Sequence, residues 1–78
     1  MLKIKQYLKN LDNDTLKKLF KISELEDIEY WVLTYGLIQK RMVENTCMKL
    51  NISRAYYFIL QNKALIKVYF KLKELQKI

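Results

Sequence analysis

The near absence of proline and glycine is the feature that most limits what this chain can fold into. Its 78 residues contain no proline and one glycine, Gly36. Tight β-turns and hairpins depend on these residue types, whereas the plentiful leucine, lysine and glutamate favour helices. A chain of this length buries only about 60 to 65 % of the surface that its unfolded form exposes, so it supports one core. We therefore expect a single all-α domain over residues 1–78.

Hydrophobic periodicity predicts five helices, of which the last is the longest. Ser23 and Glu26 have the spacing of a capping box at the start of the third helix, and Gly36 is expected to end it. The predicted fold is a small helical bundle of four to five helices with a C-terminal helix-turn-helix and a long last helix. The expected helices span residues 2–9, 14–21, 24–35, about 38–49 and 54 to about 76.

A sharp corner is predicted between the fourth and fifth helices. Asn51 tolerates the left-handed backbone that a tight helix exit needs, and Ser53 is a favourable N-cap for the next helix. Cys47 should lie where the two helices cross and only a small side chain fits. Two helices joined in this way, the second rich in polar and basic side chains, are typical of a helix-turn-helix. We expect that motif over about residues 38–65.

The net positive charge of the chain lies entirely in its second half. The net charge is +7, with six lysines and six acidic residues in 1–39 but nine basic and two acidic residues in 40–78. A polyanion such as double-stranded DNA would be attracted there by Coulomb steering and by counterion release. Charge alone is equally compatible with lysines that keep a hydrophobic small domain soluble.

The side chains around the predicted corner are candidates for contacts with DNA. Arg54 is the candidate for a guanine edge, and the nearby lysines and Arg41 are candidates for phosphates. The alternative for Arg54, Asn62 and Lys63 is a solvated helix face, and an aromatic residue such as Tyr56 often serves a core or interface. The full set of candidate DNA-binding residues is Lys40, Arg41, Lys49, Ser53, Arg54, Ala55, Tyr56, Asn62 and Lys63.

The stretch 43–65, VENTCMKLNISRAYYFILQNKAL, resembles the C-terminal helix-turn-helix of sigma factors, known as region 4. The family pattern has a small residue, a corner leucine, a turn glycine, then Ile/Val-Ser and an arginine-containing recognition helix that ends in Lys-Ala-Leu. The paired aromatics resemble still more the ArpU and RinA type of small phage transcriptional regulators. The matching residues here are Cys47, Leu50, Asn51 in place of the glycine, Ile52-Ser53-Arg54, Tyr56-Tyr57 and Lys63-Ala64-Leu65.

Counting the upstream Leu33-Thr34-Tyr35-Gly36, the resemblance covers about half of the chain and implies a transcriptional regulator from a phage or mobile element. Such a protein would bind promoter DNA non-covalently through the helix that starts at Ser53. In this chain Thr46 stands where the family has isoleucine and Asn45 where it has an acid, while Phe58 and Ile59 are apolar where sigma-like recognition helices are polar.

The last helix carries two apolar stripes, and a small bundle can cover only one of them. The second stripe predicts a protein interface, either of a homodimer through residues 66–78 or with an RNA polymerase subunit or another host protein. The alternative is that the first helix folds back over it. The first stripe is Leu60, Ala64, Val68, Leu72 and Leu75, and the second is Ile59, Ile66, Tyr69 and Phe70.

Two functions therefore compete. The leading hypothesis is a DNA-binding transcriptional regulator. The alternative is a small protein-binding adaptor or anti-activator that uses the apolar face of the last helix, and Phe58 and Ile59 favour it.

Catalysis, cofactors and membranes are not expected. The chain has no histidine and a single cysteine, Cys47, so a His/Cys zinc site, a histidine base and an internal disulfide all lack their residues. We therefore expect no enzyme activity, no metal, no cofactor and no small-molecule substrate. No apolar run is long enough for a signal peptide or a membrane span, which predicts a cytoplasmic protein without a membrane partner.

Overall fold

The computed structural model describes residues 2–76, and within them all regular structure is helical. A π-helical turn, η1 (Thr34–Ile38), continues the third α-helix without a break. The predicted all-α bundle with a long last helix is confirmed. No helix among residues 2–76 has the length and apolar character to cross a membrane. The α-helices are α1 (Leu2–Lys9), α2 (Asn13–Ile22), α3 (Asp27–Leu33), α4 (Val43–Leu50) and α5 (Arg54–Glu74).

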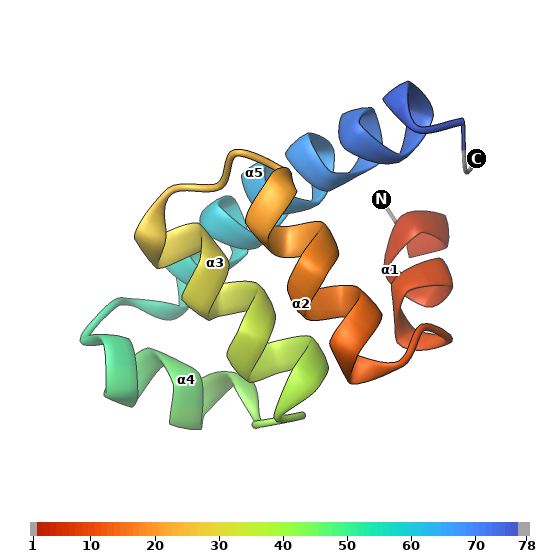
Figure 1. Cartoon of the computed structure of the whole chain (residues 1–78). Helices are drawn as coiled ribbons and strands as arrows, with labels where there is room; N and C mark the ends of the chain where they lie inside the picture. Colours follow the sequence, from red (N-terminus) through yellow and green to blue (C-terminus); the bar gives the residue numbers. More distant parts are fainter. Residues whose placement is uncertain (1, 77–78) are drawn as a thin grey trace.

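The long helix α5 is the element around which the bundle is organised. It packs against each of the other four helices (Figure 1). Helix α1 lies beside its C-terminal half, and α4 lies near its start (Figure 1). The fold therefore presents α5 with one face turned to the bundle and the other to solvent.

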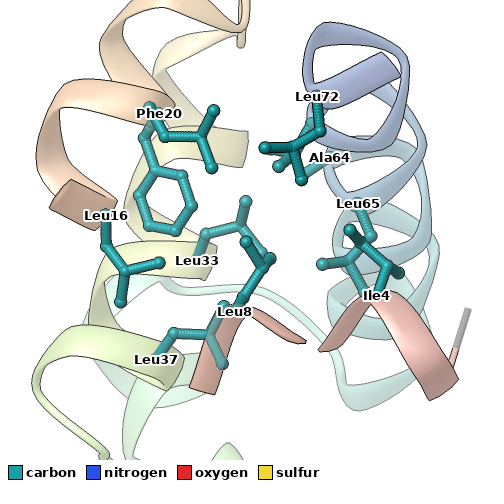
Figure 2. Close-up of a cluster of buried hydrophobic side chains, with 11 residues drawn as sticks. Ile4, Leu8, Leu16, Phe20, Leu33, Leu37, Ala64, Leu65 and Leu72 are labelled. Atoms are coloured by element: carbon teal, nitrogen blue, oxygen red, sulfur yellow. The ribbon is translucent and has the colours of Figure 1, made fainter. Parts of the chain in front are cut away.

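The larger part of the core lies between α5 and helices α1, α2 and α3 with η1. Figure 2 shows α1 and α2 side chains facing those of α5 across this cluster. Phe20 also meets Tyr30 of α3 edge to face, with ring centroids 6.5 Å apart. The buried members are Ile4, Leu8, Leu16, Leu19, Phe20, Leu33, Leu37, Ala64, Leu65, Val68 and Leu72.

A smaller cluster lies under the α4–α5 corner. Val32, Tyr57 and Leu60 are buried there, and Val43 and Cys47 of α4 pack against them. This cluster fixes which side of α5 faces inward at its first two turns, so it sets the orientation of the candidate DNA-binding residues.

The third helix starts and ends differently from the prediction. Ser23 does not cap it; its hydroxyl donates to the carbonyl of Leu19 at 2.6 Å, inside the bundle at the end of α2. Glu24 instead adopts a left-handed backbone with φ of 58°, so the helix begins at Asp27 with Glu26 as its N-cap. The predicted capping box at Ser23 and Glu26 is thus wrong, because the serine satisfies a carbonyl of the preceding helix.

Gly36 does not end the helix either. It lies within η1, and the left-handed residue that follows the helix is Lys40, with φ of 54°. A Cβ atom at Gly36 would stand 3.3 Å from the hydroxyl oxygen of Tyr57, so the glycine permits a close approach of α5. Because η1 extends to Ile38, the fourth helix begins at Val43, not near residue 38.

A buried carboxylate ties α3 to α5. Glu29 is 1 % exposed and accepts from the backbone N–H of Glu26 at 2.9 Å and from Lys67 Nζ at 2.6 Å. The hydrogen bond that Lys67 donates to Glu29 raises the pKa of the lysine above its ordinary value of 10.5. Because the pKa of Lys67 is raised in the folded state, the ion pair stabilises the fold fully at pH values below the unfolded-state pKa of the lysine. This contribution is lost as pH rises through the folded-state pKa.

We predict that Lys67→Met lowers the free energy of unfolding by about 1–3 kcal/mol, because it leaves the Glu29 carboxylate buried without its counterion. Urea denaturation at neutral pH, followed by circular dichroism, measures this loss. The exposed Lys63 on the same helix provides the control, since Lys63→Met should change stability by less than about 0.5 kcal/mol. Adding Glu29→Gln to Lys67→Met should recover part of the loss, and equal effects of the two lysine replacements would contradict the prediction.

Candidate nucleic-acid interface

The corner between α4 and α5 has the geometry that the sequence predicts. Asn51 ends α4 in the left-handed conformation, with φ of 56° and ψ of 52°. The N–H of Ile52 donates back to the carbonyl of Cys47 at 3.0 Å. Ser53 then caps α5, its hydroxyl oxygen accepting from the N–H of Tyr56 at 3.1 Å. Each group satisfies a helix end that would otherwise lack a partner.

The small residue at the helix crossing is only partly as predicted. Cys47 is half-buried, and its Sγ lies 3.8 Å from the carbonyl oxygen of Ser53. The residue of α4 with no exposed surface is its neighbour Thr46. The hydroxyl of Thr46 has no hydrogen-bond partner among residues 2–76. The fully enclosed side chain of α4 is therefore Thr46, next to the predicted Cys47.

Inward packing of α5 turns its first residues outward. Tyr57 is 2 % exposed and Leu60 3 %, whereas Arg54, Ala55 and Tyr56, which precede Tyr57 at the start of the helix, are exposed to solvent. Asn62 and Lys63 are exposed as well, about two turns or 12 Å further along α5. All nine candidate DNA-binding residues are exposed, so none is withdrawn into the core.

Arg54 is held by two neighbours. Its guanidinium forms an ion pair with Glu44 of α4 at 2.5 Å and lies 5.5 Å from the ring centroid of Phe58. The backbone N–H of Glu44 and the hydrogen bond from Arg54 lower the pKa of the Glu44 carboxyl. Both side chains are more than half exposed, so solvent screens the pair and little free energy is needed to separate Arg54 from Glu44.

The structure brings Arg41 and Lys49 together on one aromatic ring. The guanidinium carbon of Arg41 lies 5.4 Å, and Lys49 Nζ 5.9 Å, from the ring centroid of Tyr35. Trp31 stacks on the same ring, with centroids 5.3 Å apart. Residues far apart in the sequence thus form one cationic and aromatic cluster, which we call the Tyr35 cluster: Trp31, Tyr35, Arg41 and Lys49.

Arg41 is the most firmly positioned cation of this cluster. Its guanidinium donates to Gln39 Oε1 at 2.7 Å and to Asn45 Oδ1 at 2.8 Å. Among residues 2–76, neither Arg41 nor Lys49 forms an ion pair with a carboxylate. Their charge therefore stays available to an external anion. The sequence prediction missed Trp31 and Tyr35, whose spacing of four residues on a helix was the only available signal.

The outward face of α5 carries the candidate protein-interface residues as well. Ala55, Ile59, Asn62 and Ile66 follow one another at intervals of four, three and four residues, which places them on one side of the helix. Phe70 extends this face. The two predicted interfaces are therefore not on opposite sides of α5, because the residues proposed for DNA and for protein alternate along one stripe.

Three details of the predicted apolar stripes are corrected. Tyr69 is half-buried and packs against the larger core cluster. Leu75, expected in the inner stripe, is exposed. Helix α1 does not cover Ile59, Ile66 and Phe70, because its Ile4 and Leu8 join the cluster of inward-facing residues on α5. Ile59, Ile66 and Phe70, which we call the outer stripe of α5, are thus left open to solvent.

Comparison of the chain with protein-family models, with curated proteins and with solved structures yields no match. The resemblance to sigma region 4 therefore depends on the sequence pattern within residues 33–65 alone.

We predict that Ser53→Ala lowers the free energy of unfolding by about 1 kcal/mol, because the N–H of Tyr56 loses its acceptor at the start of α5. Chemical denaturation followed by circular dichroism measures the change. Ser53→Asp keeps an acceptor and adds a negative charge at the positive end of the helix, so it should retain the stability of the native chain. A loss of the same size in both variants would show that the hydroxyl does not cap α5.

Proposed function

We propose that this chain is a DNA-binding transcriptional regulator of the sigma region 4-like type, from a phage or mobile element, which contacts promoter DNA through the helix that starts at Ser53. The observation that carries the proposal is the capped corner at residues 51–53, which is followed by an exposed helix start. As a transcription regulator it would act in the cytoplasm, which agrees with a lone, unpaired cysteine.

The positions of the cations support a division of labour at the DNA. Arg54 lies in the first turn of α5, where recognition helices read base edges in the major groove. Arg41 and Lys49 lie on the Tyr35 cluster, outside that helix, and suit phosphate contacts that fix the register of the protein on the duplex. The net charge of +7 adds attraction that does not depend on DNA sequence.

The apolar residues of α5 limit where bases can be read. Ile59 and Ile66 are large exposed hydrophobic residues on the same face as Ala55 and Asn62. Ala55 and Ile59 can contact a thymine methyl group but offer no hydrogen bond to a base edge. Base reading by hydrogen bonds would then fall to Arg54, with Asn62 reaching an adenine further along the groove.

We predict that Arg54 and Lys49 act differently on DNA affinity. A duplex enriched from a random pool is titrated beside a scrambled duplex at two salt concentrations. Arg54→Ala should reduce the preference for the enriched duplex about 10- to 100-fold, because a bidentate contact to a base is lost. Lys49→Ala should weaken both duplexes alike and lower the slope of log affinity against log salt by about 1, because one phosphate contact is lost.

Lys17 provides the matched control for these variants. It is exposed on α2, outside the candidate set, so Lys17→Ala should change neither the preference nor the slope by a comparable amount. Absence of binding to any duplex at low salt would remove the proposed function, and equal losses on both duplexes with Arg54→Ala would remove its base-reading role.

A protein-binding role is the second candidate, and the outer stripe of α5 favours it. Ile59, Ile66 and Phe70 are 51 %, 42 % and 62 % exposed. Large apolar side chains gathered on one helix face are typical of sites that bind another protein. Such a partner would be a second copy of the chain, an RNA polymerase subunit or another host protein, and the chain would then serve as an adaptor or anti-activator.

If the partner is a second copy, sedimentation of the nuclease-treated chain should give twice the mass of one chain. Ile66→Lys should then return the mass to that of a monomer, because the charge enters an apolar contact. Ile22→Lys is the control, since Ile22 is an exposed isoleucine that belongs to α2 and not to α5. A monomer at all concentrations would exclude the homodimer, and a single host protein retained in stoichiometric amount after nuclease treatment would favour the adaptor.

A further inference from the structure

Two adjoining hollows lie between α1 and the segment that joins η1 to α4. Their volumes are about 410 and 140 Å³. Both are lined by Lys9, Gly36, Leu37 and Arg41, so they form one depression, which we call the α1 cleft. The larger volume is comparable to that of pockets that hold small ligands in other proteins.

The charged residues that line the α1 cleft are all basic. Lys9 and Arg41 line both hollows, Lys40 lines the larger and Lys5 the smaller, and no aspartate or glutamate lines either one. None of the four forms an ion pair among residues 2–76. Four like charges around one depression repel each other, and an anion between them would relieve that repulsion.

The inner hollow adds neutral polar groups. Tyr57 and Gln61 line it, both with little exposure, and Gln61 Nε2 donates to the Tyr57 hydroxyl at 3.3 Å. Burial raises the pKa of Tyr57, so the hydroxyl stays protonated at neutral pH. Its proton has no acceptor among residues 2–76 and is free to donate to an oxygen of an anion in the cleft.

Arg41 gives the cleft a pre-positioned donor. Its hydrogen bonds to Gln39 and Asn45 and its place over Tyr35 restrict the guanidinium, so little side-chain entropy is lost when an anion binds. A planar guanidinium with several N–H donors matches the oxygens of a phosphate.

We propose that the α1 cleft binds a phosphate group through Lys5, Lys9, Lys40 and Arg41. The phosphate belongs either to a nucleic-acid backbone or to a free phosphate compound. In the first case the proposal rests on the proposed function and extends the DNA contact from the helix-turn-helix onto α1, because Lys40 and Arg41 border both.

The first arm of the test uses sodium pyrophosphate as the probe. At constant ionic strength, pyrophosphate at about ten times its dissociation constant should raise the Tm of the native chain by about 5–10 °C relative to chloride. The double variant Lys5→Met and Lys9→Met should lose this shift, and Lys40→Gln should reduce it. Lys17→Met, on the exposed face of α2, should keep it.

The second arm measures duplex DNA binding at two salt concentrations. If the cleft holds backbone phosphates, the Lys5→Met and Lys9→Met double variant should lower the slope of log affinity against log salt by about 2. It should leave the preference of the protein for the enriched duplex, which we ascribe to Arg54, unchanged. A pyrophosphate shift that the double variant abolishes, together with an unchanged slope, would assign the cleft to a free phosphate compound.

The inference is overturned if the double variant alters neither the pyrophosphate shift nor the salt slope. Failure of the native chain to bind any duplex would remove the proposed function alone, because the pyrophosphate arm still decides whether the cleft binds phosphate.

Discussion

Helices α1 to α4 all pack against the inner face of α5, where Leu60, Ala64, Leu65, Val68 and Leu72 are buried. Removing each of the larger of these side chains from water is worth about 1.5–3 kcal/mol, so this one face supplies a large part of the stability of a small bundle. The direction of α5 is fixed at the same time by the corner at Asn51 and Ser53. The burial of the inner face and the direction set by the corner together determine which residues of α5 are exposed to solvent.

The outer face of α5 therefore follows from the inner one. Once Tyr57 and Leu60 point inward, helical geometry leaves Ala55, Ile59 and Asn62 on the opposite side. These residues mix apolar and polar character, and they belong to both of the candidate interfaces. A duplex in contact with Asn62 and a protein partner in contact with Ile59 would occupy the same surface. The two proposed functions thus exclude each other on one copy of the chain at one time, unless a partner restricts itself to Ile66 and Phe70.

The local features of the corner could be predicted because each residue acts through its own backbone. The left-handed preference of Asn51 and the capping hydroxyl of Ser53 require no knowledge of the rest of the fold. The first and last residues of the third helix were harder to predict. Ser23 and Gly36 carry the usual signals of a helix start and a helix end, but Ser23 bonds to α2 and Gly36 accommodates Tyr57 of α5. Contacts between distant segments decided both positions.

Charge gave a similar mixture of success and failure. The surplus in residues 40–78 pointed to Arg41 and Lys49 as available cations, and both are exposed and unpaired with carboxylates among the described residues. Sequence reasoning could not place Arg41 and Lys49 together, because the ring of Tyr35 that they share comes from η1. The even charge of residues 1–39 also concealed the role of Lys5 and Lys9 of α1, since these residues are neutral as a whole. Folding places Lys9 in one hollow with Lys40 and Lys5 in the adjoining one, and no carboxylate lines either hollow.

The pairing of Arg54 with Glu44 bears on how a DNA contact would be made. An exposed ion pair of this kind contributes about 0–1 kcal/mol, so opening it costs little, yet it keeps the guanidinium near the start of α5 before any duplex arrives. The same carboxylate repels a phosphate that approaches too closely. Arg54 would therefore be guided toward base edges in the groove, while Arg41 and Lys49, which have no such neighbour, would remain the stronger attractors of the backbone.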